Sequence, residues 1–290
     1  AKAIGGEIIS ADSMQVYKEM DIGSAKIRPE EMDGVPHHLV DVLDPSEDFN
    51  VVFFQQMAKE AMEGIYTRGR IPVLVGGTGF YIQALLYDID FTSTSQDDNY
   101  RQDLENLAKE KGAEYLHNML REIDPKSAED IHANNIKRVI RALEYYHQTG
   151  QKMSRHNEEE RQKESPYEFV YFVLNAPREQ LYQRIDRRVD QMMSEGLVEE
   201  VKRLKEMGCT KEMVSMQGLG YKEILAYLDG EYALDEAVYT IKRDTRHFAK
   251  RQLTWFRRER QVTWIQKEKY DYDEEKILEA MISHLEGKIC

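Results

Sequence analysis

The sequence of 290 residues has few cysteines, no long apolar run and no excess of positive charge. Its two cysteines, Cys209 and Cys290, are far apart and form no C-x-x-C or Cys/His cluster, which argues against a disulfide framework and a zinc site. No apolar stretch approaches the length needed to cross a bilayer, so we expect no membrane partner. A reducing cytoplasm is the compartment that this cysteine usage favours.

The formal net charge of -13 argues against nonspecific coating of nucleic acid, because phosphates attract basic surfaces. The positive charge is nevertheless concentrated in one region. Residues 241–260 contain eight Lys and Arg residues against two acidic ones. This uneven distribution is typical of a protein that docks a structured RNA at one face.

Apolar patterns alternate between strand and helix in the first part of the chain. The runs 6–9 and 71–75 predict strands, and residues 52–68 between them predict a helix. The helix would bury one stripe at four-residue spacing, made of Phe53, Met57, Ala61 and Ile65. Strand, helix and strand in this order predict an α/β fold with a mostly parallel sheet flanked by helices.

A helical insertion is predicted for residues 95–165. The polar stretch 92–99 indicates a linker, helical patterns dominate residues 100–150, and the charged stretch 157–164 predicts an exposed return segment. We therefore expect a first part of the core in residues 1–94, the insertion in 95–165, and a second part of the core in 166–290.

The second part of the core begins with an aromatic and β-branched run at residues 167–174, which predicts a strand that re-enters the core sheet. The pattern of the remaining residues is mostly helical. The expected elements are helices over 178–207, 221–228 and 234–258, a strand at 262–265, and a last amphipathic helix.

Both early strands end in polar segments, SADSMQVY at residues 10–17 and GGTGFY at residues 76–81. In open α/β sheets the loops at the carboxyl ends of strands face the crevice that holds ligands. Asp12 is a candidate proton acceptor, although Asp at this position also caps turns and helices. Thr78 lies between glycines, which allow a ligand's phosphoryl oxygen to approach its hydroxyl, although such a turn also begins ordinary helices.

These two segments resemble those of the tRNA dimethylallyltransferases, and the likeness continues in the same order over nearly the whole chain. The further matching segments are GVPHHLVD at 34–41, RVIRALE at 138–144, QGLGYKE at 217–223 and KRQLTWF at 250–256. The resemblance implies a core like that of the P-loop NTPases with an all-helical insertion domain for tRNA. It points to a bacterial-type protein.

The resemblance implies a transferase that moves a dimethylallyl group from dimethylallyl diphosphate to the exocyclic N6 of an adenine next to the anticodon, releasing diphosphate. Asp12 would accept the proton from N6, and Thr78 would hold the oxygen that bridges the prenyl group and the diphosphate. Because a base inside a folded loop must be flipped out to react, Asp12, Ser13, Met14 and Gln15 would bind the flipped adenine.

Arg184 and Arg188 are the candidate diphosphate ligands besides Thr78. They are four residues apart, so they share a helical face and suit a diphosphate clamp. The resemblance favours Arg188. The alternative is that they form surface ion pairs with the nearby acids Asp186, Asp190 and Glu195.

Mg²⁺ is the expected cofactor, bound to the diphosphate. Its usual protein ligand in this family lies in a phosphate-binding loop of the pattern G-x-x-x-x-G-K-[ST], which no stretch of the sequence matches. Residue 1 is Ala, and residues 1–5 resemble the end of the helix that comes after such a loop. We therefore expect the loop to precede residue 1, and the metal ligands within the chain are not predicted.

The tRNA anticodon stem-loop is the second expected substrate. Besides Asp12 to Gln15, the resemblance assigns the tRNA contacts to Arg101, Lys137, Arg138, Val139, Ile140, Arg141, Gln217, Gly220, Tyr221, Lys222, Arg246, Lys250 and Arg251. The alternative for the charged members is a solvated helix face. Trp255 is expected in the core rather than as a stacking platform, and His37 and His38 as hydrogen-bonded residues rather than metal ligands.

Two other functions remain open at this level. One is a noncatalytic RNA-binding relative, and the other is a prenyltransferase or kinase that acts on free adenine nucleotides. The basic residues Lys137 to Arg141 favour RNA over a free nucleotide, since a small substrate has no use for a basic helical insertion. No protein partner is indicated, so we expect a monomer.

Overall fold

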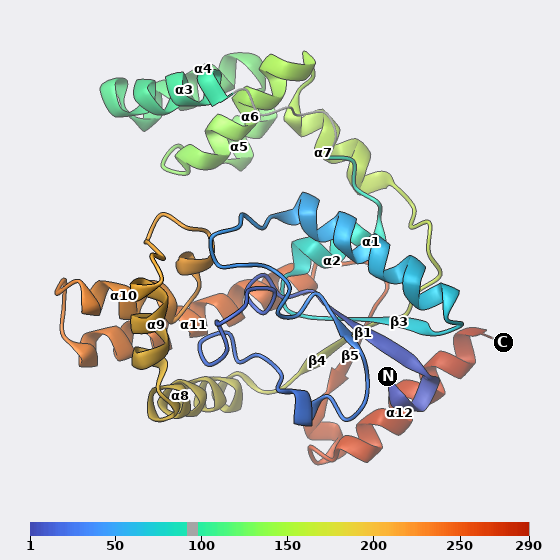
Figure 1. Ribbon diagram of the computed structural model, residues 1–290. Coiled ribbons are helices and arrows are strands. Elements are labelled where there is room, and N and C mark those ends of the chain that lie inside the picture. Colours follow the sequence, from blue (N-terminus) through green and yellow to red (C-terminus); the bar gives the residue numbers. More distant parts are fainter. Residues whose placement is uncertain (92–97, 290) are drawn as a thin grey trace. The chain divides into compact units, whose positions relative to one another are not determined.

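The computed structural model describes residues 1–91 and 98–289. The chain divides into two compact units, which Figure 1 shows coloured along the sequence. The core unit contains Ala1–Leu85 and Glu168–Cys290, and the helical unit contains Leu86–Tyr167. The predicted boundary at residues 94 and 95 falls outside the described residues and stays a prediction.

The core unit contains a parallel three-stranded sheet in the order β2-β1-β3, with strands β1 (Gly6–Ser10), β2 (His37–His38) and β3 (Ile71–Val75). β1 pairs with β3 from Gly6 opposite Ile71 to Ser10 opposite Val75. β1 is almost wholly buried, as is usual for a central parallel strand. The two strands predicted from the apolar runs are confirmed.

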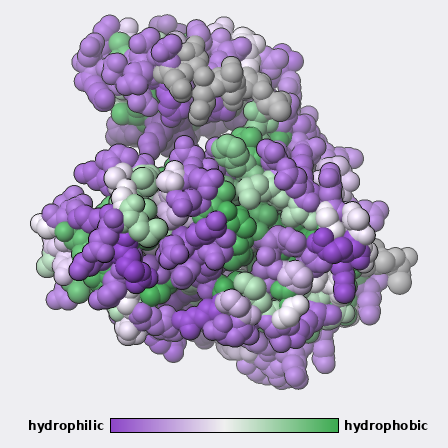
Figure 2. All heavy atoms as spheres, in the orientation of Figure 1, coloured by the Kyte–Doolittle hydropathy of each residue, from purple (hydrophilic) through white to green (hydrophobic). Residues whose placement is uncertain are grey.

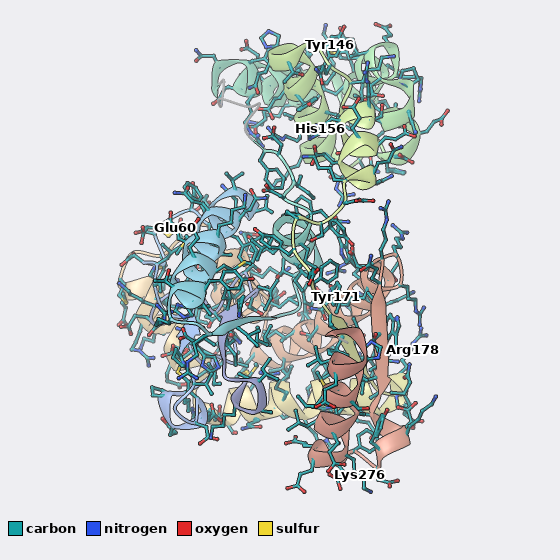
Figure 3. The ribbon with its side chains drawn as sticks, turned by 90° about the vertical axis from the view of Figure 1, so that its right-hand side faces the viewer. Glu60, Tyr146, His156, Tyr171, Arg178 and Lys276 are labelled. Atoms are coloured by element: carbon teal, nitrogen blue, oxygen red, sulfur yellow. The ribbon has the colours of Figure 1, made fainter. Side chains whose placement is uncertain are left out.

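Strand β4 (Tyr171–Asn175) pairs in parallel with β5 (Val262–Gln266). Figure 3 labels Tyr171 on β4 and Arg178 at the beginning of the next helix. The expectation that residues 167–174 form a strand of the first sheet is wrong, because the described strand begins at Tyr171 and is hydrogen-bonded to β5. An apolar run shows that a strand is buried, and it carries no information about which strand is its partner.

Helix α1 (Val51–Thr67) packs on β1 and β3. The side chain of Asn50 begins the helix by accepting hydrogen bonds from the backbone N–H groups of Val52 and Phe53. The buried stripe differs from the predicted one and consists of Phe54, Gln55, Ala58, Met62 and Ile65, whereas Phe53 is 47% exposed. Two consecutive phenylalanines satisfy the same period, so the spacing alone does not identify the buried face.

The rest of the core unit is mainly helical. Its α-helices are α2 (Gly79–Leu86), which reaches the start of the helical unit, α8 (Arg178–Glu195), α9 (Leu197–Glu206), α10 (Tyr221–Leu228), α11 (Leu234–Phe256) and α12 (Glu274–Ile289). Short 3-10 turns are η1 (Lys2–Ile4), η2 (Pro29–Glu31), η3 (Ser215–Gln217) and η4 (Lys267–Tyr270). Helix α11 packs against α8 and α10. Figure 2 shows a largely hydrophilic face on which apolar side chains gather near the middle of the core unit.

The helical unit consists of α3 (Asp98–Lys111), α4 (Ala113–Ile123), α5 (Pro125–Asp130), α6 (Ile136–Thr149) and α7 (Met153–Gln162). Its own apolar core includes Leu104, Leu116, Leu120, Val139, Ile140 and Leu143. The buried carboxylate of Asp124 joins α5 to α7, because it accepts hydrogen bonds from the hydroxyls of Ser127 at 2.7 Å and Ser154 at 2.6 Å. The predicted return segment is exposed but mostly helical, since α7 extends to Gln162 without a buried residue.

An α/β core with parallel strands and a helical domain is thus confirmed. Within residues 1–91 and 98–289, no helix has the length and apolar character that a bilayer span requires.

Candidate active site

The loops that come after β1 and β3 lie side by side and are hydrogen-bonded to each other. Ser10 pairs with Val75 at the ends of the strands, the N–H of Ala11 donates to the carbonyl of Val75 at 2.7 Å, and the N–H of Thr78 donates to the carbonyl of Ala11 at 3.2 Å. A Cβ atom at Gly76 would lie 2.3 Å from that same carbonyl oxygen. The structure therefore brings the segments of Asp12 and Thr78 together, and glycine at 76 is required for their approach.

The two carboxylate oxygens of Asp12 have different surroundings. Oδ1 accepts hydrogen bonds from the backbone N–H groups of Met14 at 2.7 Å and Gln15 at 3.2 Å, so it closes the turn. Oδ2 makes no hydrogen bond to any residue in the described part of the chain, and Asp12 is partly exposed. Asp12 can therefore both close the turn and accept a proton, because Oδ1 serves the first role and Oδ2 is available for the second.

The phenol of Tyr81 is affected by the charge of Asp12. Burial raises the pKa of Tyr81 well above its ordinary value, and the charges of Tyr17 and Asp12 add to this increase.

Thr78 begins helix α2. Its carbonyl accepts hydrogen bonds from the N–H groups of Tyr81 at 2.9 Å and Ile82 at 3.2 Å. Its hydroxyl has no hydrogen-bond partner among residues 1–91 and 98–289, and the side chain is partly exposed. Thr78 thus combines a free hydroxyl with the positive end of a helix dipole, the combination that binds phosphoryl oxygens.

Helix α11 covers the glycine-rich loop. Nε2 of Gln252 donates to the carbonyl of Gly77 at 2.9 Å, and a Cβ atom at Gly79 would lie 2.3 Å from the indole of Trp255. The ring of Trp255 also contacts Phe80, with ring centroids 6.0 Å apart. Trp255 is therefore partly buried and packs against the glycine-rich loop and Phe80.

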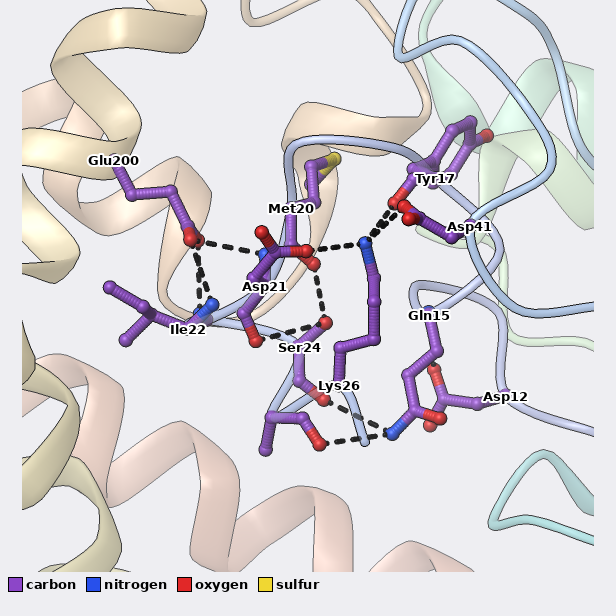
Figure 4. A network of polar contacts seen from close by, with 12 residues as sticks. Asp12, Gln15, Tyr17, Met20, Asp21, Ile22, Ser24, Lys26, Asp41 and Glu200 are labelled. Carbon is purple, nitrogen blue, oxygen red and sulfur yellow. Dashed lines mark hydrogen bonds and ion pairs between the residues drawn. The ribbon is translucent and has the colours of Figure 1, made fainter. Parts of the chain in front are cut away.

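Gln15 is held by a second loop. Its Nε2 donates to the backbone carbonyls of Ser24 at 3.4 Å and Ala25 at 3.2 Å (Figure 4). Since both acceptors are carbonyls, they assign the NH₂ end of the amide. The other end, Oε1, accepts a long hydrogen bond from the hydroxyl of Ser10 at 3.5 Å. Met14 packs on the 217–223 segment, because a Cβ atom at Gly218 would lie 2.6 Å from its Cε.

Two residues of this region, Lys26 and Glu200, were not identified from the sequence. Lys26, whose side chain is only 6% exposed, binds the carbonyl of Tyr17 at 2.6 Å and the carboxylates of Asp21 and Asp41 (Figure 4). Glu200 on α9 accepts hydrogen bonds from the 21–23 backbone. Neither residue belongs to a pattern with a recognisable spacing, so no sequence signal would have found them.

The acids that were the alternative partners of the α8 arginines are paired elsewhere. Asp186 binds Arg246, Asp190 binds Lys242, and Glu195 lies 3.8 Å from Arg28. Arg184 and Arg188 are exposed and have no ion-pair partner in the described chain, so this surface-pair alternative is wrong.

Arg184 lines a hollow of about 470 Å³ with other cationic and polar side chains and no acidic one. The lining residues are Gln180, Gln183, Arg184, Arg187, Lys267 and Tyr272. No residue of the Asp12 or Thr78 loop contributes to it, so the structure does not join Arg184 to that pair.

The tRNA candidates of the helical unit divide into exposed and buried groups. On α6, Lys137, Arg138 and Arg141 are exposed, whereas Val139 and Ile140 are buried in the unit's core. Arg101 forms ion pairs with Glu105 and with Glu144, which is only 4% exposed. The exposed cations of α6 therefore lie where RNA phosphates could reach them, and the side chains of Val139 and Ile140 support the helix that carries them.

The tRNA candidates of the core unit are similarly divided. Lys250 and Arg251 are exposed, and the guanidinium of Arg251 lies 5.7 Å from the ring of Phe248. Tyr221 is fully buried, Arg246 is paired with Asp186, and the amide of Gln217 donates to the carbonyl of Lys211.

The remaining two core-unit candidates lie at the start of α10. The N–H of Gly220 donates to Glu223 at 2.8 Å, and Nζ of Lys222 lies 3.5 Å from the same carboxylate. Burial raises the pKa of Glu223, while the Gly220 N–H and Lys222 oppose this shift. The backbone of Gly220 and the ammonium of Lys222 therefore have protein partners at this position.

His37 and His38 are hydrogen-bonded to protein groups. Nδ1 of His37 lies 2.8 Å from the carbonyl of Val35, and Nε2 of His38 lies 2.8 Å from the carboxylate of Glu7. In residues 1–91 and 98–289 no three His, Cys, Asp or Glu side chains come together as a metal site.

Comparison with known proteins identifies relatives over nearly the whole chain. The IPP transferase family model matches residues 15–259. The tRNA dimethylallyltransferase of Lachnoclostridium phytofermentans is 60% identical over 99% of this chain and 92% of its own length.

Two solved structures are similar in fold as well as in sequence. The tRNA isopentenylpyrophosphate transferase of Bacillus halodurans has a TM-score of 0.73 and 48% identity, covering 99% of this chain and 89% of that one. A eukaryotic dimethylallyltransferase acting on tRNA has a TM-score of 0.74 and 33% identity, covering 88% of this chain and 64% of that one. The chain therefore belongs to the IPP transferase family, to which its sequence motifs pointed.

Proposed function

We infer that the protein is a tRNA dimethylallyltransferase that transfers the dimethylallyl group of dimethylallyl diphosphate to N6 of an adenine next to the anticodon. The observation that carries this function is the pair of joined loops, in which Oδ2 of Asp12 and the hydroxyl of Thr78 are both without hydrogen-bond partners in the described chain. The names and high identity of the relatives support the same reaction.

In the reaction, the N6 nitrogen forms a bond to the first carbon of the dimethylallyl group while the bond from that carbon to the diphosphate oxygen breaks. Oδ2 of Asp12 accepts the proton that N6 loses. The Thr78 hydroxyl donates to the bridging oxygen, which gains negative charge as diphosphate leaves. Because Oδ1 is fixed by the turn, the carboxylate needs no reorientation before it reacts.

Mg²⁺ would be held mainly by oxygens of the diphosphate. Mg²⁺ is commonly bound through one or two protein oxygens together with substrate phosphates, and this mode suits the described residues, among which no cluster of acidic ligands occurs. When bound, the ion neutralises the charge of the departing diphosphate. Arg188 on α8 is exposed and unpaired in the described chain, and it supplies a further positive charge for the same group.

The exposed cations of α6 and α11 would bind the anticodon stem-loop through its phosphates. The cations of the expected set that are exposed and lie on α-helices are Lys137, Arg138, Arg141, Lys250 and Arg251. Contacts to phosphates position an RNA, while groups beside the reacting base read its identity. We propose that a single copy of the chain is sufficient for this reaction.

The variant Asp12→Asn tests the role of Asp12. Asn keeps an oxygen that accepts from Met14 and Gln15, but its amide does not accept a proton. We expect kcat to fall by about 10²–10⁴-fold, with the Kd for tRNA unchanged. Single-turnover kinetics and tRNA titration measure the two quantities.

Asp44→Asn is the matched control. Asp44 also closes its own turn, because its Oδ1 accepts from the N–H of Ser46 at 3.0 Å. Its substitution should leave kcat unchanged. An Asp12→Asn enzyme with the kcat of the unsubstituted protein would remove Asp12 from the role of base.

A further inference from the structure

A single buried carboxylate organises the loop that holds Gln15. Glu200 of α9 is 1% exposed. Its Oε2 accepts from the backbone N–H groups of Asp21 at 3.0 Å and Ile22 at 2.8 Å, and its Oε1 accepts from Gly23 at 3.1 Å (Figure 4). Three consecutive N–H groups thus converge on one anion, an arrangement that fixes a loop in one conformation.

Tyr221 of α10 completes this arrangement. Its hydroxyl donates to Oε1 of Glu200 at 2.7 Å and accepts from the N–H of Ser24 at 3.1 Å. The ring occupies the space beside Gly23, where an added Cβ atom would lie 2.6 Å from it. All four groups that bind Glu200 are donors, so a carboxylate suits this position and an amide does not.

The loop fixed in this way is the one that orients Gln15. The carbonyls of Ser24 and Ala25 accept both hydrogen bonds from Nε2 of Gln15. Ala25 has a φ of 48°, in the left-handed region that non-glycine residues rarely adopt. Such a conformation persists only when the surrounding contacts enforce it. The bonds from Glu200 and Tyr221 to the preceding residues are contacts of this kind.

We propose that Glu200 and Tyr221 are positioning residues for the reacting adenine, acting through the 21–25 loop and Gln15 without touching the RNA. With its NH₂ group engaged by the loop, Gln15 presents Oε1 to one hydrogen of the adenine amino group while Asp12 faces the other. Oε1 already accepts a long hydrogen bond from the hydroxyl of Ser10 at 3.5 Å, and an amide oxygen can accept a second one. This inference rests on the proposed function. It assigns roles to two residues that lie outside the loops where the chemistry occurs.

Tyr221→Phe tests the proposal, because it removes the hydroxyl and keeps the ring that fills the space beside Gly23. We expect kcat with tRNA to fall about 10-fold or more, since Ser24 and Glu200 each lose a partner and one of them is charged. The Kd for dimethylallyl diphosphate should not change. Tyr232→Phe is the matched control, because that hydroxyl donates to the carbonyl of Glu223 at 3.0 Å on the same helix, and it should leave kcat unaltered.

A double-mutant cycle separates positioning through Gln15 from a general loss of structure. If Tyr221 acts through Gln15, the double variant Tyr221→Phe/Gln15→Ala has the same kcat as Gln15→Ala alone. If the reductions in kcat caused by the two single substitutions multiplied in the double variant, the proposal would be overturned. Turnover is expressed per site that binds dimethylallyl diphosphate, so partial unfolding of a variant does not affect the comparison.

Glu200→Gln provides a second and independent variant. Its amide places NH₂ against backbone N–H groups, so we expect the same loss of kcat and the same absence of a further loss in combination with Gln15→Ala. If Tyr221→Phe and Glu200→Gln both kept the kcat of the unsubstituted protein, the positioning role would be refuted and the proposed function would remain intact. An unsubstituted protein that does not prenylate tRNA would instead contradict the proposed function.

Discussion

At the scale of single residues, Glu7 shows how strongly a buried acid can depend on its partners. Its carboxylate accepts from Nε of Arg68 at 3.0 Å and Nη2 at 2.7 Å, and Nε2 of His38 lies 2.8 Å away. Hydrogen bonds from Arg68 and then His38 lower the pKa of Glu7 to about 2, against the opposing effect of burial. The folded protein therefore holds the ionised form of Glu7 more tightly than the unfolded chain does.

This lowered pKa predicts a pH-dependent contribution to stability. An unfolded Glu has a pKa of about 4.3, so the contribution of Glu7 is complete above that pH and is lost as the pH falls toward about 2. Glu7→Gln should lower the free energy of unfolding at pH 7, and its difference from the unsubstituted protein should shrink between pH 4.5 and 2. Urea denaturation across this range measures the difference.

Glu63→Gln is the control for this experiment, because Glu63 is an exposed residue of α1. Its effect on unfolding should be small at every pH. A difference between Glu7→Gln and the unsubstituted protein that stayed constant from pH 7 to pH 2 would contradict the assigned ion pair.

At the scale of elements, helix α6 has one buried apolar face and one exposed basic face. Val139, Ile140 and Leu143 lie in the core of the helical unit, while Lys137 and Arg138 are exposed. Arg138→Ala should weaken tRNA binding and make the slope of log K against log salt shallower by about 1, because one phosphate contact is lost. Affinity for dimethylallyl diphosphate should not change. Titrations at several salt concentrations measure the slope.

Lys109→Ala on α3 serves as the matched control, since Lys109 is an exposed cation of the same unit outside the predicted RNA set. It should bind tRNA as the unsubstituted protein does. An Arg138→Ala protein with an unaltered salt slope would exclude Arg138 as a phosphate ligand.

The elements themselves could largely be predicted, because strands and helices have characteristic periods. Helix α10 begins and ends at the predicted residues, and α11 ends two residues before the predicted end. Three expectations at this scale were wrong. The helix expected over 178–207 is divided into α8 and α9 by Gly196, whose φ of 101° lies in the left-handed region. The buried stripe of α1 is rotated because Phe53 and Phe54 are equally apolar, and β4 pairs with β5 because pairing depends on contacts between distant parts of the chain.

At the scale of the whole molecule, the helical unit has the features of an independently folding domain. It has its own apolar core, and Asp124 joins two of its helices. A polypeptide of residues 86–167 should therefore unfold cooperatively on heating, as measured by circular dichroism. Leu120→Ala in that polypeptide should reduce its stability by about 2–5 kcal/mol. A gradual, non-cooperative transition would show that the unit needs the rest of the chain.

The candidate site could be predicted only in part. Asp12, Thr78 and Gln15 could be proposed from the sequence because they lie in short motifs at the ends of predicted strands. Glu200 could not be proposed from the sequence, because 179 residues separate it from Asp21 and no local pattern indicates that the two interact. Motifs can therefore suggest candidate reacting groups, whereas candidate positioning residues can be identified only from contacts in the folded chain.

The long separation between Glu200 and its loop has a consequence for how the enzyme is made. Residues 21–24 leave the ribosome long before α9 and α10 are synthesised. The hydrogen bonds of this segment to Glu200 and Tyr221 can therefore form only late in translation. A nascent chain that ends before Tyr221 would contain Asp12 and Thr78 but would lack the hydroxyl that binds Glu200 and Ser24. Catalytic competence would then be acquired late in translation, after most of the polypeptide has emerged.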